Sequence, residues 1–277
     1  MIKRIITAVI ATIAILPVLW FSDMAIFPTA VAIASVICIY EFSHCVGLHK
    51  NIAMTLPLYL AALVFPFLTR YVDNGIAAMI GFICAGLYVI YLFALTIWSH
   101  GKIAHKDMCT FCLMSFYIII AMCMLVYVRD FGENGRFIYF LVFIGAWITD
   151  IFAYFTGVFF GKHKLIEDVS PKKTIEGSIG GTVFCSAGFV VLGLIAELFG
   201  ADANLIFLAI GGIIIAVIAQ IGDLIMSVVK RHYGIKDYGK MFPGHGGMLD
   251  RVDSLMAVSL ALGAMCMFSF VTGIPLM

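Results

Sequence analysis

The chain is dominated by apolar runs that are long enough to cross a lipid bilayer, which takes about 20 residues of helix. Nine such runs fall near residues 5–21, 24–40, 53–68, 75–98, 109–128, 137–160, 177–199, 204–229 and 254–276. Only 12% of the residues are charged and 63% are hydrophobic, whereas about 25% are charged in soluble proteins. We therefore expect an all-α, polytopic integral membrane protein with about nine transmembrane helices joined by short loops.

The basic residues are distributed unevenly between the loops. With the N-terminus in the cytoplasm, 14 of the 17 Lys and Arg residues lie on the cytoplasmic side, and only Arg70, Arg129 and Arg136 lie opposite. This asymmetry fits the positive-inside rule. It places the two longest loops, 161–176 and 230–253, in the cytoplasm, where nucleotides and magnesium are abundant. The near-neutral total charge gives no indication of a nucleic-acid partner.

Two aspartates, Asp150 and Asp223, stand inside apolar runs. A carboxylate in the middle of a membrane helix costs about 2.5–3.5 kcal/mol on insertion scales, so such a residue faces a polar cavity or a partner. A structural pairing with a lysine from a neighbouring helix is the alternative for either aspartate taken alone. A helical stripe that continues from Asp223 toward the cytoplasmic end favours a functional role, and its members are Ser227, Lys230 and Arg231.

A second narrow stripe begins at Asp150 and continues through Tyr154, Gly157 and Gly161. Its two glycines lack side chains, and small residues allow membrane helices to approach closely. We interpret these glycines as packing positions.

The segment 230–253 concentrates charge and glycine between two apolar runs. Asp250 and Asp253 are three residues apart at the start of the last helix, so they share a face and, with Asp223, offer three carboxylates near the cytoplasmic interface. Mg²⁺ is typically held by one or two carboxylates plus substrate phosphates. Next to His245, Gly246 and Gly247 have backbone N–H groups that an anion can approach closely.

Basic residues complete this pattern. Lys230, Arg231, Lys236 and Arg251 are suited to neutralising phosphate charge. Carboxylates, cations and a glycine-rich turn together are what phosphoryl or nucleotidyl transfer requires. The other long loop adds Ser170, Lys172, Lys173 and Thr174, although a basic cytoplasmic loop is also explained by topology or by contact with anionic lipid. No GxxxxGK[ST] motif occurs, so the chain is not a P-loop ATPase.

The pattern S-x-V-K-R-x4-K-D-x-G-x2-F-P-x-H-G-G-M-x-D-R-x-D over residues 227–253 resembles the signature of the phosphatidate cytidylyltransferases, or CDP-diacylglycerol synthases. A second stretch agrees with this family: D-x2-A-Y from residue 150, F-G-K at 160–162 and S-P-K-K-T-x-E-G at 170–177. The first 145 residues carry nothing diagnostic. The resemblance implies about nine membrane helices, a homodimer, and synthesis of CDP-diacylglycerol and pyrophosphate from CTP and phosphatidic acid.

The resemblance also implies roles for individual residues. It makes Asp223 and Asp250 the ligands of Mg²⁺. Whether a second cation also binds is left open. We expect the catalytic residues to be Asp223, Lys230, Arg231, Asp250 and Asp253. We expect the substrate-binding residues to be Asp150, Ser170, Lys172, Lys173, Thr174, Ser227, Lys236, Asp237, His245, Gly246, Gly247 and Arg251.

These expectations divide the chain into residues 1–145, about five helices that form a scaffold and dimer interface, and residues 146–277, a catalytic region with a polar site facing the cytoplasm. The expected location is a bacterial cytoplasmic (inner) membrane. One alternative is a CTP-dependent kinase or cytidylyltransferase acting on a polyprenol, phytol or ether lipid. Another is an ion-coupled transporter that uses the two intramembrane aspartates, but transporters usually contain inverted repeats and the sequence shows no internal repeat.

Overall fold

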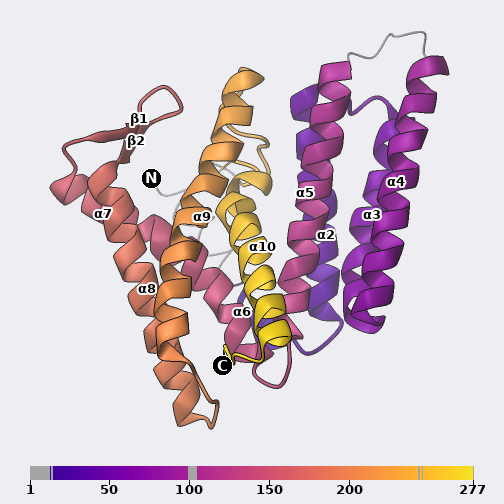
Figure 1. Cartoon of the computed structure of the whole chain (residues 1–277). Coiled ribbons are helices and arrows are strands. Elements are labelled where there is room, and N and C mark those ends of the chain that lie inside the picture. The colour runs from indigo at the N-terminus through magenta and orange to yellow at the C-terminus, as the bar shows by residue number, and fades with distance from the viewer. Residues whose placement is uncertain (1–12, 14, 99–104, 243, 245, 277) are drawn as a thin grey trace. The chain divides into compact units, whose positions relative to one another are not determined.

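The computed structural model describes residues 13, 15–98, 105–242, 244 and 246–276, and they are almost entirely helical (Figure 1). Within this part of the chain, eight helices are long and apolar enough to cross a membrane. They match eight of the nine predicted runs, which confirms the prediction of an all-α, polytopic membrane protein. The remaining run, 5–21, lies mostly outside the described residues.

The chain divides into two compact units. Unit 1 comprises the chain up to Val126 together with Ile235–Asp250, and unit 2 comprises Tyr127–Gly234 together with Arg251–Met277. These are geometric units, whereas the predicted boundary after residue 145 separates a scaffold from a catalytic region. That functional division stays a prediction.

Unit 1 is built on the helices α2 (Ile26–Val46), α3 (Ile52–Tyr71), α4 (Asn74–Trp98) and most of α5 (His105–Arg129). Helix α2 ends at Gly47, whose φ of 78° suits glycine, and α3 begins where the side chain of Asn51 accepts a hydrogen bond from the N–H of Met54. Helices α2 and α3 pack side by side, and α4 packs on α3. Most of the apolar surface of α4 is exposed, which suits a helix in contact with lipid.

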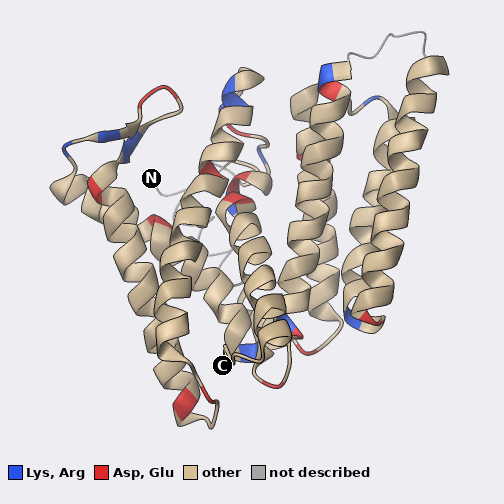
Figure 2. Ribbon diagram, viewed as in Figure 1, with Lys and Arg blue, Asp and Glu red and all other residues tan. Residues whose placement is uncertain are grey.

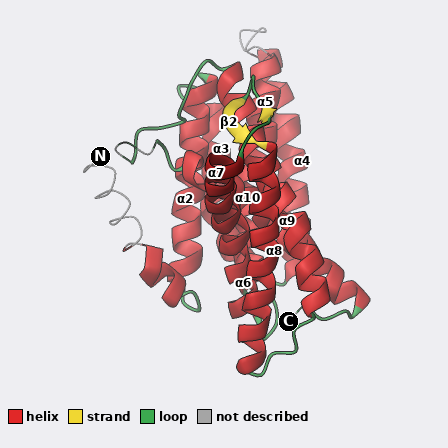
Figure 3. Cartoon of the chain, turned by 90° about the vertical axis from the view of Figure 1, so that its left-hand side faces the viewer, coloured by secondary structure: helices red, strands yellow, loops and turns green. Residues whose placement is uncertain are grey.

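After the last residues of α5, unit 2 continues with one membrane-length helix in three parts: α6 (Gly135–Phe143), the π-helical segment η1 (Ile144–Ile148) and α7 (Thr149–Phe160). A short antiparallel hairpin follows, made of β1 (Lys164–Ile166) and β2 (Ser170–Thr174), where we expected only a loop. Helices α8 (Ile175–Leu198) and α9 (Leu205–His232) come next, and α10 (Leu249–Thr272) starts in unit 1 and continues in unit 2. In Figure 3 the strands lie at one end of the helices of unit 2.

Helix α8 packs along both α7 and α9, and small residues make this possible. A Cβ atom added at Gly157 would lie 3.7 Å from the Cα of Gly177 on α8 and 2.8 Å from Oγ1 of Thr174. At Gly181 an added Cβ would lie 2.7 Å from the carbonyl oxygen of Thr149. The interpretation of Gly157 as a packing position is therefore confirmed.

Candidate active site

Acidic side chains from three helices gather near the hairpin end of unit 2. Helix α7 contributes Asp150, α9 contributes Asp223 and α10 contributes Asp253. Each lies close enough to the others to interact electrostatically. Asp253 is 8% exposed, and its Oδ1 accepts a hydrogen bond of 2.8 Å from the N–H of Ser254. The sequence placed two of these aspartates in apolar runs, and the structure brings them together with a third.

Basic and hydroxyl groups offset this negative charge. Nζ of Lys173, on strand β2, forms an ion pair of 2.5 Å with Oδ2 of Asp223, and both side chains are about a quarter exposed. The hydroxyl of Ser254 donates to Oδ2 of Asp150 at 3.2 Å. The positive charge of Lys230 attracts the carboxylate of Asp253, and that of Arg251 attracts the carboxylate of Asp150. We did not predict a role for Ser254. The only indication in the sequence was that it directly follows Asp253.

The predicted stripe on α9 is confirmed as a continuous helical face. Ser227 and Lys230 are half-buried, Arg231 is exposed, and the helix continues through them to His232. Figure 2 shows basic residues at this end of α9 and on the hairpin, while the middle of most helices carries none. Cations from two separate elements of unit 2 thus lie at its hairpin end.

The four residues of the hairpin that we predicted to bind substrate have different surroundings in the structure. Lys172 is exposed, whereas Lys173 is paired with Asp223. The hydroxyl oxygen of Thr174 accepts the N–H of Gly177 at 3.1 Å and so caps α8. Ser170 is half-buried at the start of β2. Roles of these residues in substrate binding stay predictions.

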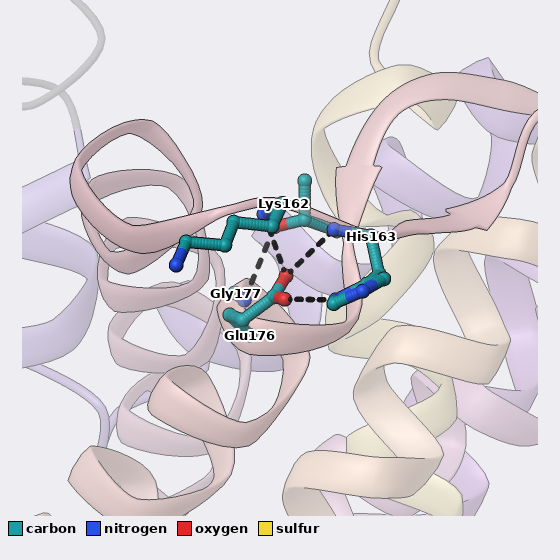
Figure 4. A network of polar contacts seen from close by, with 5 residues as sticks. Lys162, His163, Glu176 and Gly177 are labelled. Carbon is teal, nitrogen blue, oxygen red and sulfur yellow. Dashed lines mark hydrogen bonds and ion pairs between the residues drawn. The ribbon is translucent and has the colours of Figure 1, made fainter.

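Glu176, in the first turn of α8, ties the hairpin to that helix (Figure 4). Its Oε2 accepts the N–H groups of Lys162 and His163 at 3.1 and 3.2 Å, and its Oε1 lies 2.6 Å from Nδ1 of His163. The carboxylate therefore fixes the segment that leaves α7 against the start of α8. Glu176 stands in the second motif stretch, but we did not assign it a role from the sequence.

The glycine-rich segment 235–250 belongs to unit 1. Asp250 is 8% exposed, and its Oδ2 accepts the N–H groups of Tyr238 at 2.8 Å and Gly247 at 3.0 Å. The N–H of Gly247, which we expected to face an anion, is thus directed at a protein carboxylate. Gly246 has a φ of 86°, which explains why glycine is required there.

Other residues that we predicted to bind substrate in or beside this segment have exposed side chains. Lys236 and Asp237 are exposed, as Arg251 is in unit 2. His245 lies outside the described residues, so its predicted contact with substrate stays a prediction.

The metal ligands also remain a prediction. Among the residues that the structure describes, no group of three or more His, Cys, Asp or Glu side chains is placed to hold a metal ion. Mg²⁺ does not require such a group, because one or two carboxylates plus substrate phosphates and water complete its octahedral shell. Asp223 belongs to unit 2 and Asp250 to unit 1, and their use as joint ligands rests on the sequence pattern.

Membrane-length helices that carry a cluster of carboxylates and cations define an integral membrane protein with a polar cluster among its helices. The family model described as the cytidylyltransferase family matches residues 2–269, and the chain belongs to this family. The resemblance inferred from the two motif stretches is therefore confirmed.

Several similar proteins from staphylococci are named phosphatidate cytidylyltransferase. The protein from Staphylococcus epidermidis is 32% identical over 260 residues, covering 92% of this chain and 95% of the relative. The protein from Staphylococcus aureus is 32% identical over 261 residues, with the same coverage. The protein from Staphylococcus saprophyticus is 39% identical over 170 residues, covering 60% of this chain and 62% of the relative.

Proposed function

We propose that this protein transfers the cytidylyl group of CTP to phosphatidic acid and so makes CDP-diacylglycerol and pyrophosphate for phospholipid biosynthesis. The observation that carries this proposal is the likeness to proteins named phosphatidate cytidylyltransferase, which extends over 92% of the chain. Family membership alone supports only cytidylyl transfer. The lipid acceptor is supported by the placement of the polar cluster on membrane-length helices.

The proposed reaction is a direct displacement. A phosphate oxygen of phosphatidic acid attacks the α-phosphorus of CTP, the bond from that phosphorus to the bridging oxygen breaks, and pyrophosphate leaves with the electron pair. No covalent enzyme intermediate is required. The catalytic demand is therefore to neutralise charge and to align the two substrates.

Charged residues of unit 2 suit this demand, and Asp250 of unit 1 joins them on the sequence pattern alone. We propose that Asp223 and Asp250 hold Mg²⁺, which supplies charge neutralisation at the phosphates when it is bound. Nζ of Lys173 is buried and pairs with Asp223, so this ammonium group is placed to exchange the carboxylate for a substrate phosphate that enters the cluster. Lys230 and Arg231 extend the positive charge to the end of α9. Asp150 attracts Lys173, and Asp253 attracts Lys230, so these two cations are held toward the cluster.

We further propose that the protein is a homodimer in the cytoplasmic membrane of a bacterium and that its site faces the cytoplasm. The bacterial relatives and the eight apolar helices support the membrane. The excess of Lys and Arg in the loops 161–176 and 230–253 supports the orientation. A cytoplasmic site gives CTP direct access, while the phosphate of the lipid reaches it from the membrane interface.

The test is an assay with purified protein, CTP labelled in the cytidine ring, phosphatidic acid and Mg²⁺. We expect label to enter the lipid extract only when phosphatidic acid is present. Removal of Mg²⁺ with EDTA is expected to abolish the signal, and added Mg²⁺ is expected to restore it. Labelling of a polyprenol or ether lipid in place of phosphatidic acid would contradict the proposed acceptor.

A further inference from the structure

Glu41, in helix α2, is a buried acidic residue whose partners lie more than 200 positions away in the sequence. It is 5% exposed. Its Oε1 accepts the N–H of Met248 at 3.0 Å, and its Oε2 accepts the N–H of Leu249 at 2.8 Å. Helix α10 begins at Leu249, and the first N–H groups of a helix have no partner within it. Glu41 therefore caps α10 from another helix of unit 1, and its negative charge suits the positive end of the helix dipole.

Two glycines of the 235–250 segment make room for this carboxylate. A Cβ atom added at Gly239 or at Gly247 would collide with side-chain atoms of Glu41, which are the three nearest atoms in both cases. Neither glycine has a positive φ, so turn geometry does not explain them. Their lack of a side chain is explained by the close approach of Glu41.

The same turn carries Asp250. Its Oδ2 accepts the N–H groups of Tyr238 and Gly247, while Glu41 accepts those of Met248 and Leu249. Three consecutive N–H groups, from Gly247 to Leu249, are thus bound by two carboxylates. The backbone that supports the Asp250 side chain cannot turn without breaking the hydrogen bonds to Glu41.

We propose that Glu41 is a positioning residue for cytidylyl transfer: its carboxylate fixes the glycine-rich turn and the first turn of α10, and so sets the direction of Asp250. This inference rests on the proposed function. It gives a role in the reaction to the N-terminal region, which carries no recognisable motif. The N–H groups of Gly247, Met248 and Leu249 are already engaged by protein carboxylates, so these three are not offered to a substrate phosphate.

A double-mutant cycle tests the contact without any assay of activity. Gly239→Ala is expected to lower the melting temperature of the detergent-solubilised protein, because the new methyl group collides with Glu41. In a Glu41→Ala background the same change is expected to have little effect, since the space is then open. Gly86→Ala is the matched control, because a Cβ at this helical position meets nothing within 4 Å. Equal effects of Gly239→Ala in both backgrounds would overturn the contact.

A kinetic experiment tests the positioning role. Glu41→Gln keeps the shape of the side chain but offers one acceptor oxygen to two N–H donors. We expect kcat per folded enzyme to fall at least tenfold and the Mg²⁺ requirement to rise, with the KM for phosphatidic acid within twofold of wild type. Glu197→Gln, at an exposed position near the end of α8, is expected to change none of these values.

Glu41→Asp serves as a second variant if Glu41→Gln does not fold. It keeps both oxygens but withdraws them by one methylene, and we expect a smaller loss of kcat with the same rise in Mg²⁺ requirement. If the variants lower the melting temperature but leave kcat and the Mg²⁺ requirement unchanged, Glu41 is only a structural cap and the inference is wrong. Absence of cytidylyl transfer in the wild-type protein would instead contradict the proposed function.

Discussion

At the scale of single residues, the ion pair between Lys173 and Asp223 is the contact that most directly links the hairpin to the intramembrane acids. Both side chains are about a quarter exposed and Nζ of Lys173 is itself buried, so salt and solvent screen this pair less than a surface ion pair. Its importance is electrostatic, because Lys173 is the cation in direct contact with a proposed metal ligand.

We therefore expect Lys173→Ala to lower kcat by about 100-fold, as removal of one preorganised charge typically does. Its neighbour Lys172 is exposed, and Lys172→Ala is expected to change kcat less than threefold. The measurement is the initial rate at saturating CTP and saturating phosphatidic acid, normalised to folded protein, so that a role of Lys172 in substrate binding does not enter it. Equal losses in the two variants would show that the ion pair has no part in the reaction.

The two proposed metal ligands give a second prediction. Asp223→Asn and Asp250→Asn preserve side-chain volume and remove charge, so both proteins are expected to insert into the membrane while turnover falls about 1,000-fold. Asp168→Asn, at an exposed hairpin position, is the control and should retain wild-type turnover. A variant that kept more than about a tenth of the wild-type rate would exclude that aspartate as a ligand.

Some of these residues were visible in the sequence and others were not. Asp150 and Asp223 stand out because a carboxylate inside an apolar run is costly unless it faces a partner or a polar cavity. The pairing of Lys173 with Asp223 was not predictable, because it depends on how a hairpin folds back toward a helix 50 positions later. Glu41 was missed because we ended its apolar run at residue 40, whereas α2 continues to Val46 and makes Glu41 a buried helical residue.

At the scale of elements, helix–helix contacts depend on glycines that face one another. A Cβ at Gly177 would meet the carbonyl oxygen of Ala153 and would lie 2.9 Å from Oγ1 of Thr174. Gly177→Ala is expected to destabilise the protein by about 1–3 kcal/mol, the usual cost of overpacking, and to lower activity because Thr174 adjoins Lys173. Thermal unfolding in detergent measures the first effect. An unchanged melting temperature would contradict this close contact between α7 and α8.

The elements themselves were predictable to different degrees. The eight described membrane helices agree with the apolar runs within a few residues, because hydropathy and length determine them. The hairpin was missed because its strands have only three and five residues, too few for an alternating pattern to be recognised, and β2 is mostly polar. The π-helical segment Ile144–Ile148 has no sequence signal, although it directly precedes the helix that carries Asp150. Such segments occur often at functional sites.

At the scale of the whole molecule, the charge distribution and the order of the helices determine the topology. In unit 2 the hairpin and the end of α9 lie at one end, and the C-terminus lies at the other (Figure 1). A cytoplasmic hairpin therefore places the C-terminus outside the cytoplasm. A reporter that is active only in the cytoplasm should be silent when it is fused after Met277 and active when it is inserted at residue 168. Cytoplasmic activity at Met277 would reverse the proposed orientation or change the number of crossings.

In the proposed reaction cytidylyl, and not phosphate, passes from CTP to a membrane lipid. The most direct measurement compares two preparations of CTP, one labelled with ³²P at the α-phosphate and one at the γ-phosphate, each incubated with purified protein, phosphatidic acid and Mg²⁺. We predict that α-label enters the lipid extract in equal amount to released pyrophosphate, while γ-label stays in the aqueous phase as pyrophosphate. Transfer of γ-label to the lipid would identify a lipid kinase and contradict cytidylyl transfer.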